Sequence, residues 1–320
     1  MHPSLAPRAE LPVVHGDRFE IAPQGPFSLR EAALFGFGQR HDDAFDGWMR
    51  LAFCLDGYAS QVGVAVRQDA HGIVHGEVAG TAGEPPAIAA VAAHVARVLS
   101  LDCDARSFGA LGEGDPVLAK LLAAAPGLRP PLFYSPYEAA LWSVLSARRP
   151  RRTAEKWRSA LSRAAGASFE VAGREQWSMP LPQRLVQLGA QGIAEACGAD
   201  VVRTQRMAAI ATAACAGQLD AKRVTSTDLS SARADLQKLP GIGPFYADLI
   251  LIRASGHTDV LPAREPKFLG LLGELYDLGA PATETQAERI AQAWSPWRTW
   301  TAVLVRAAGP RVTSIRAEDE

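Results

Sequence analysis

The chain has 320 residues, of which 48% are hydrophobic and 21% are charged, and its formal net charge is −1. No membrane-spanning helix is predicted, because no window approaches the ~20 consecutive apolar residues that such a helix needs. The nearly neutral charge argues against nucleic-acid binding over the whole surface, so any such affinity must come from local basic clusters.

The length predicts two or three globular domains, since domains usually contain ~100–200 residues. Residues 1–16 lack the apolar core of a signal peptide and are predicted to be a flexible tail. The four cysteines form no metal-binding or redox pattern, which favours a reducing, cytoplasmic environment. They are Cys54, Cys103, Cys197 and Cys215.

Residues 17–127 are predicted to form an α/β domain. Short runs typical of strands are separated by turn residues such as Asp56-Gly57, and an alanine-rich helix follows them. Ser28 is a suitable N-cap for an earlier helix. The predicted strands cover residues 18–22, 48–54, 61–68 and 73–80, and the predicted helices cover residues 28–37 and 86–99. The simplest assembly is a small antiparallel sheet with a covering helix.

Residues 128–320 are predicted to be almost entirely helical. A stretch rich in proline and glycine, residues 126–136, marks the boundary with the preceding domain. Pro296 is expected to kink or break the last helix. The predicted helices cover residues 137–146, 153–165, 181–188, 191–196, 201–216, 229–239, 244–254, 266–278 and 283–307.

The segment LPGIG, residues 239–243, lies between two of these predicted helices. Pro240-Gly241 predicts a tight turn, and Pro244 opens the second helix at a position where its missing N–H costs nothing. The first turn of that helix would point backbone N–H groups outward, where they can bind a phosphate. An ordinary corner between packed helices fits the short motif equally well, but the flanking helices at fixed offsets favour a binding site.

The loop at residues 259–266 contains a candidate catalytic carboxylate. Pro266 disfavours a helical conformation at Glu265 and starts the next helix itself. Glu265 is therefore expected at the N-cap, where helix N–H groups stabilise its negative charge. A purely structural N-cap is the alternative.

Four arginines lie within five residues, at Arg148, Arg149, Arg151 and Arg152. Such a cluster could neutralise several phosphates of a nucleic acid. A solvated basic loop is the alternative interpretation.

Two further runs carry aromatic residues. Residues 137–146 read YEAALWSVLS and precede the arginines, and residues 294–300 read WSPWRTW. Most of the large aromatic side chains in the second run are expected to pack between helices rather than contact a ligand.

In their order and spacing, these segments resemble the helix-hairpin-helix DNA glycosylase superfamily, most of all its bacterial 3-methyladenine DNA glycosylase II members. Residues 137–146 resemble the family's Y-E-A-A-x-W-x-x-x-S-Q-R run, and residues 294–300 resemble its W-x-P-W-R-S/T-Y/W run. The resemblance covers nearly the whole chain. It implies an α+β protein, in which an antiparallel sheet domain like half of a TATA-binding protein precedes all-α glycosylase domains, with the helix-hairpin-helix at residues 229–254.

The resemblance implies a DNA glycosylase of base excision repair. Such an enzyme flips an alkylated or otherwise damaged purine out of double-stranded DNA and hydrolyses its N-glycosidic bond. Lyase-type relatives carry a nucleophilic lysine where this chain has Phe245, so we expect base excision without strand cleavage. We also expect a monomer at the nucleoid in the cytoplasm, with no membrane contact and no required cofactor.

The resemblance also assigns roles to single residues. Glu265 stands at the catalytic carboxylate, which stabilises the positive charge that develops on the deoxyribose or activates water. Arg148 stands at the wedge that fills the gap left by the flipped nucleotide. The residues implied to contact the DNA backbone are Gly241, Gly243, Phe245, Arg151 and Arg152. The residues implied at the base pocket are Trp142, Tyr246, Leu249 and Arg306. The backbone carbonyls implied to hold a Na⁺ or K⁺ ion are those of Gln237, Leu239 and Ile242.

The chain departs from the family at four places around the implied pocket. Ala147 replaces a glutamine, and Glu265 is one methylene longer than the family's aspartate. Leu249 and Arg306 replace aromatic residues that grip an extruded cationic base. An arginine would repel such a base unless it is paired or points away. We therefore expect either a substrate other than simple N-methylpurines or weak activity.

Two alternatives remain. One is a non-catalytic protein that binds damaged DNA on the same scaffold. The other is a metal-dependent enzyme, for which His71 and His75 are the only close histidine pair, with no acidic or cysteine partner at metal-binding spacing. These two are expected to be ordinary surface histidines.

Overall fold

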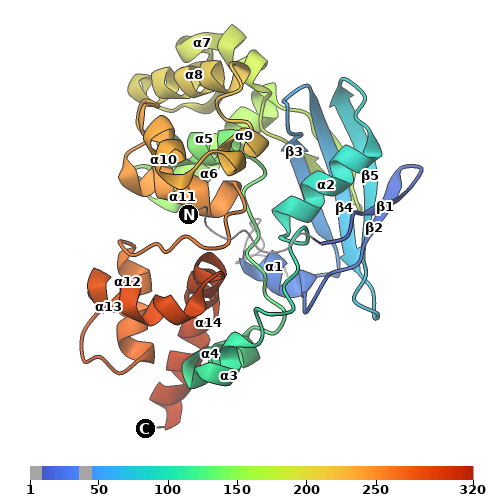
Figure 1. The fold of residues 1–320 in the computed structure, drawn as a ribbon. Coiled ribbons are helices and arrows are strands. Elements are labelled where there is room, and N and C mark those ends of the chain that lie inside the picture. The colour runs from blue at the N-terminus through green and yellow to red at the C-terminus, as the bar shows by residue number, and fades with distance from the viewer. Residues whose placement is uncertain (1–8, 36–44, 320) are drawn as a thin grey trace.

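A five-stranded antiparallel sheet stands beside two groups of helices in the computed structural model, which describes residues 9–35 and 45–319 (Figure 1). The strands lie in the order β1-β2-β5-β4-β3. They are β1 (Val13–His15), β2 (Arg18–Ile21), β3 (Met49–Cys54), β4 (Ser60–Gln68) and β5 (Val74–Gly83). The expected sheet is therefore confirmed, and β1 adds a strand inside the stretch expected to be a tail.

Strand β4 is buried along most of its length because both faces of the sheet are covered. Helices α1 (Leu29–Phe35) and α2 (Ile88–Val98) pack on one face and share an apolar core with the strands. Ser28 caps α1, as predicted, by accepting a hydrogen bond from the Glu31 N–H at 3.2 Å.

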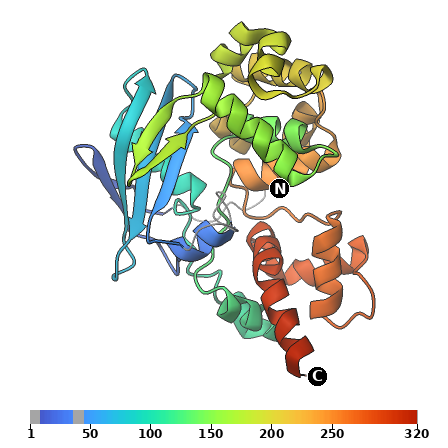
Figure 2. The same cartoon turned by 180° about the vertical axis from the view of Figure 1, so that it is seen from behind.

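A hairpin that the sequence did not predict covers the second face of the sheet (Figure 2). It consists of β6 (Ser168–Val171) and β7 (Arg174–Trp177), which pair antiparallel. Ala172 and Gly173 join the strands with φ angles of 42° and 74°, as a tight two-residue turn requires. The region expected to be almost entirely helical therefore also contains one strand pair, at residues 168–177.

Packing against the sheet fixes this hairpin in place. Phe169 forms a small core with Ala52, Ala65 and Val171. Gly63 makes room for the ring, because a Cβ at Gly63 would lie only 2.5 Å from the Cβ of Phe169. The segment thus pairs as strands because it gains apolar contacts with a distant part of the chain.

The larger group of helices forms the upper body in Figure 1 and shares one core. It comprises α5 (Pro136–Ser146), α6 (Arg151–Ala165), α7 (Pro182–Cys197), α8 (Val201–Cys215), α9 (Ala221–Ser226), α10 (Leu229–Gln237) and α11 (Pro244–Ala254). Gly189 breaks α7 with a φ of 62°, which agrees with the two short helices predicted there.

The smaller group of helices forms the lower body and has its own core. It comprises α3 (Leu111–Gly114), α4 (Pro116–Ala124), α12 (Pro266–Leu275), α13 (Glu284–Ile290), the 3₁₀ helix η1 (Ala291–Trp294) and α14 (Arg298–Asp319). Phe108, Leu118 and Leu121 belong to this core, so residues 105–125, expected with the sheet, instead pack on the C-terminal helices. Pro296 lies in the break between η1 and α14, as predicted.

Trp294, Trp297 and Trp300 are almost fully buried in the same core. Phe108 contacts the edges of Trp297 and Trp300, with ring centroids 5.8 and 5.3 Å away. The expected packing role of the WSPWRTW run is therefore confirmed. Among the described residues, no helix combines the length and apolarity needed to cross a membrane.

Candidate functional site

The hairpin between α10 and α11 leaves room for close approach of an anion. Gly241 has a φ of 90°, and a Cβ there would lie 2.8 Å from Cδ of Arg206 on α8, so this position requires glycine. Gly243 is the N-cap of α11 with an extended backbone, and a Cβ there would meet nothing within 4 Å. The space beside Gly243 at the N-terminus of α11 is therefore open, as phosphate binding requires.

Two aromatic residues follow this N-terminus. Phe245 is 54% exposed. Its ring meets that of Tyr246 edge to face, with centroids 5.2 Å apart. Tyr246 is half-buried and packs on the core of the upper helices. Phe245 thus offers an apolar surface directly beside the open hairpin.

The three carbonyls predicted to hold a cation belong to the end of α10 and to the hairpin. Gln237 is the last residue of α10, and Leu239 and Ile242 are buried. The Ile242 N–H donates to the Leu239 carbonyl at 3.0 Å and closes the turn. A carbonyl oxygen has two lone pairs, so this bond leaves the Leu239 oxygen able to contact a cation as well.

Glu265 lies where the sequence predicts it, at the N-cap of α12. Its Oε2 accepts a hydrogen bond from the Phe268 N–H at 2.7 Å, and its Oε1 accepts one from the Lys267 N–H at 3.3 Å. The backbone at Glu265 is extended, and Pro266 occupies the first helical position. The carboxylate is thus held in place by the helix N-terminus, with 24% of its side chain exposed.

Arg306 on α14 pairs with this carboxylate. Its Nε lies 3.5 Å from Oε2 of Glu265, and its side chain is 35% exposed. The positive charge of Arg306, which would repel a cationic base if unpaired, is therefore balanced by Glu265. The structure brings the implied catalytic residue and one implied pocket residue into direct contact.

Asp259 has a different role from Glu265. Its side chain is almost fully buried and forms a two-pronged ion pair with Arg298 at 2.7 Å for each contact. Ser295 also donates to it at 2.9 Å. Burial alone would raise the pKa of Asp259, but the hydrogen bonds and charge of Arg298 lower it below its ordinary value. Asp259 fastens the loop to the start of α14 and has no free oxygen facing solvent.

A cavity of about 420 Å³ lies between α5, α6, α11 and the linker at residues 131–134. Trp142 from α5 and Leu249 from α11, both implied at the base pocket, line it together with Phe133. This volume lies within the range of small-molecule sites, ~300–1,000 Å³. Tyr246 and Arg306 are outside its lining, so the cavity holds only two of the four implied pocket residues.

Four arginines and one glutamate also line this cavity, and most of them were not singled out from the sequence. Arg151 Nε lies 2.6 Å from Glu155 Oε1, and Arg158 follows them one turn later on α6. These three positions have i, i+4 and i+7 spacing, which places them on one face of the helix. This spacing is the sequence signal that could have identified them. The charged lining residues are Arg149, Arg151, Glu155, Arg158 and Arg253.

Arg148 is exposed in the loop between α5 and α6, with a φ of 53°. Arg203 on α8 supports this loop, because its Nη2 donates to the Ala147 carbonyl at 2.6 Å. The Arg203 guanidinium also lies 5.5 Å from the centroid of the Trp157 ring. Arg148 is thus presented on a braced loop, and Arg151 and Arg152 are exposed in the first turn of α6 beside it.

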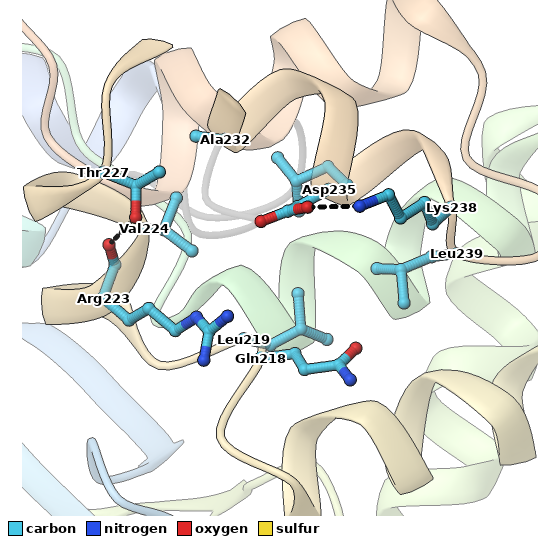
Figure 3. Close-up of a pocket in the computed structure, with 10 residues that line it drawn as sticks. Gln218, Leu219, Arg223, Val224, Thr227, Ala232, Asp235, Lys238 and Leu239 are labelled. Atoms are coloured by element: carbon cyan, nitrogen blue, oxygen red, sulfur yellow. Dashed lines mark hydrogen bonds and ion pairs between the residues drawn. The ribbon is translucent and has the colours of Figure 1, made fainter. Parts of the chain in front are cut away.

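A second cavity, of about 260 Å³, lies against α9 and α10 (Figure 3). Lys238 and Asp235 form an ion pair at 2.7 Å on its rim, and Arg223 extends along another side. Of the predicted site residues, only Leu239 lines this cavity. It is therefore separate from Glu265 and from the cavity at Trp142.

The histidine pair singled out in the sequence includes one residue, His75, with acidic partners. His75 lies 2.8 Å from Asp69 and 3.3 Å from Glu20, acidic partners that the sequence spacing did not reveal. The two carboxylates contact opposite nitrogens of one ring instead of gathering around a common point. The described part of the chain contains no group of three histidine, cysteine, aspartate or glutamate side chains that could hold a metal ion.

No protein-family model matches the sequence, but individual known proteins are similar to it. A DNA-3-methyladenine glycosylase of Bacillus subtilis is 24% identical over 200 residues, which cover 62% of this chain and 66% of the relative, just under two thirds of its length.

Solved structures share the fold over most of the chain. A 3-methyladenine DNA glycosylase from Archaeoglobus fulgidus has a TM-score of 0.73 at 20% identity and covers 89% of this chain and 96% of its own. An 8-oxoguanine glycosylase/lyase from Clostridium acetobutylicum, in complex with double-stranded DNA, has a TM-score of 0.65 at 16% identity. The match covers 95% of this chain and 99% of that protein. These matches confirm the resemblance: the chain has the fold of helix-hairpin-helix DNA glycosylases and is similar in sequence to a 3-methyladenine-type member of that superfamily.

Proposed function

We propose that the chain is a monofunctional DNA glycosylase of base excision repair, which removes a damaged purine from double-stranded DNA. The observation that carries the proposal is Glu265, a carboxylate fixed by two backbone N–H groups a short distance in sequence beyond an open hairpin. This carboxylate also pairs with Arg306, which lies in the position of a base-gripping residue in the glycosylase superfamily.

The proposed chemistry needs a fixed anion. As the bond between C1′ and the base nitrogen breaks, positive charge develops on the deoxyribose. Glu265 stabilises that charge or accepts a proton from the attacking water, and its two backbone hydrogen bonds keep it oriented without reorganisation. The cavity lined by Trp142 and Leu249 supports a role in receiving the extruded base.

DNA binding follows from surface groups rather than net charge. The open space at Gly243 suits one phosphate, and Arg151 and Arg152 suit others in the first turn of α6. Such contacts hold the backbone without reading the sequence. Arg148, exposed on the loop braced by Arg203, fills the gap that the extruded nucleotide leaves.

Base release without strand cleavage is part of the proposal. Phe245 occupies the position of the lyase-type lysine, and a phenyl ring cannot form a Schiff base with the sugar. An end-labelled duplex should remain intact after base release and break only after alkali treatment. Cleavage without alkali, trapped covalently by borohydride, would contradict this part.

The direct test of the proposal is mass spectrometry of bases released from DNA that has been treated separately with methylating, deaminating and oxidising agents. We expect release of at least one damaged purine above the level given by heat-denatured protein. No release from any of these DNAs would contradict the glycosylase proposal.

A non-catalytic protein that binds damaged DNA is the second candidate. One observation favours it: both oxygens of Glu265 are already engaged by backbone N–H groups, and Arg306 pairs with one of them. A carboxylate committed in this way could serve only as a helix cap. Lesion-dependent binding without base release in the same experiment would support this candidate.

We also propose a monovalent cation at the carbonyls of Gln237, Leu239 and Ile242, where backbone oxygens suit Na⁺ or K⁺. Such an ion would add positive charge at the hairpin. Replacing K⁺ by a bulky organic cation at constant ionic strength should then weaken DNA binding by the protein. Equal affinity in the two salts would contradict the cation site.

A further inference from the structure

Arg306 is more than a counter-charge for Glu265, because most of its donors remain available. A guanidinium has five N–H donors and stays protonated in proteins. Among the side chains that the structure describes, residues 9–35 and 45–313, the contact between Nε and Glu265 at 3.5 Å is the only ion pair of Arg306. With 35% of the side chain exposed, the two Nη groups can reach a ligand that enters beside the carboxylate.

The surroundings of Glu265 do not favour a cationic ligand. Two backbone N–H groups and Arg306 already compensate the charge of its carboxylate. A positively charged base would gain little attraction here and would meet the guanidinium group of Arg306.

Neutral and cationic purines also differ in what they need from an enzyme. An N-methylated purine that carries a positive charge leaves the sugar as a neutral base. An uncharged purine leaves as an anion, so positive charge and hydrogen-bond donors near the departing ring lower the barrier of that reaction. An arginine beside the carboxylate supplies both.

We propose that Arg306 is a catalytic residue that donates hydrogen bonds to the departing base, and that the substrates of this chain are therefore neutral damaged purines, such as deaminated or oxidised ones. The inference rests on the proposed function and names its substrate class.

The step balances without a further reactant. The bond between C1′ and N9 breaks, and its electron pair goes to the purine, whose negative charge Arg306 stabilises without giving up its proton. Water adds to C1′ and transfers a proton to Glu265. The purine anion is then protonated by solvent, and Glu265 returns its proton to solvent.

The experiment compares single-turnover base release from two duplexes of one sequence, one with hypoxanthine and one with 7-methylguanine, each opposite cytosine. Rates are divided by the spontaneous rate of each lesion, since the cationic base leaves faster by itself. We expect the chain to accelerate hypoxanthine release at least about 10-fold more than 7-methylguanine release.

The variant R306Q should lose about 100-fold on hypoxanthine, the typical cost of removing one preorganised donor, and change little on 7-methylguanine. R306K keeps the positive charge and should lie between R306Q and the wild type. The ratio of the two rates within one variant does not depend on how much protein is folded. R18Q removes an exposed arginine of strand β2 and should leave both rates unchanged.

The outcomes separate two kinds of failure. Release of both bases by the wild type, with R306Q lowering both rates equally or neither, would overturn the role of Arg306 but leave the glycosylase function intact. A larger acceleration for 7-methylguanine would overturn the substrate class. Release of neither base, together with no release from any damaged DNA, would overturn the proposed function itself.

Discussion

At the scale of single residues, Glu138 is the most perturbed carboxylate of the helical region. It is buried on α5, accepts a hydrogen bond from the Cys54 N–H of β3 at 3.4 Å, and lies 3.7 Å from Arg158. Burial raises the pKa of Glu138 to about 7, against the opposing charge of Arg158. This residue joins the sheet to the upper helices and touches an arginine of the cavity.

Its pKa predicts a dependence of stability on pH. The folded protein holds the Glu138 proton up to a pH of about 7, whereas the unfolded chain loses it near the ordinary value of 4.5. The contribution of Glu138 to the unfolding free energy is therefore present below a pH of 4.5 and is lost as the pH rises from there to about 7. Relative to E138Q, the wild type should lose about 3 kcal/mol of unfolding free energy across it.

Urea denaturation of the wild type and E138Q at several pH values measures this difference, and E77Q, which alters an exposed glutamate of β5, is the matched control. A difference between wild type and E138Q that is constant with pH would show that Glu138 titrates normally.

Arg148 allows a prediction that separates base flipping from chemistry. A wedge is useful only where a base must leave a stacked duplex, which costs a few kcal/mol. R148A should therefore slow base release from duplex DNA by about 10- to 100-fold and leave release from single-stranded DNA almost unchanged. Equal losses on both substrates would contradict the wedge role.

At the scale of elements, the two glycines of the hairpin should respond differently to the same substitution. G241A combines a φ of 90° with a Cβ 2.8 Å from Arg206, so it should lower the unfolding free energy by roughly 1–3 kcal/mol. G243A has an ordinary backbone and open space, so stability should change by less than about 0.5 kcal/mol.

For DNA binding, G243A is the informative variant. The added methyl group of G243A lies where a phosphate would approach, so duplex affinity should fall while the fold is unchanged. Thermal melting and fluorescence anisotropy measure the two effects. Unchanged affinity for G243A would contradict phosphate binding at this N-terminus.

Local structure within and between elements is where the predictions from sequence are accurate. Local signals predicted the hairpin, the cap at Glu265 and the break at Pro296, because glycine, proline and an N-cap act over a few residues. The β6–β7 hairpin was missed because its strands depend on Phe169 packing into the space at Gly63, far away in the sequence.

The pairing of Glu265 with Arg306 could not be predicted for a similar reason. Each residue was placed by its motif, but the contact arises only when α14 packs against α12 in the lower body. The sequence therefore named both residues as candidates, and the tertiary fold determines that they touch.

At the scale of the whole molecule, the described residues form three large cores and one small core, and the net charge of the chain is almost zero. The proposed DNA affinity must then come from a few exposed arginines. Replacing Arg152, which is exposed in the first turn of α6, should reduce the slope of log affinity against log salt by about 0.9. R18Q, on the sheet, should leave the slope unchanged, and an equal reduction for both variants would contradict a local DNA-binding face.

Glu265 is the proposed catalytic carboxylate, and the variant E265Q separates its role in chemistry from a role in DNA binding. The glutamine keeps the size of the side chain and one acceptor for the helix N-terminus. E284Q, which changes an exposed glutamate in the first turn of α13, is the matched control. The measurement is single-turnover base release from a lesion duplex, with duplex affinity measured in parallel. We predict that E265Q loses at least about 100-fold in rate while its affinity and the rate of E284Q stay near those of the wild type. Base release by E265Q at the wild-type rate would contradict the assignment of Glu265 as the catalytic carboxylate.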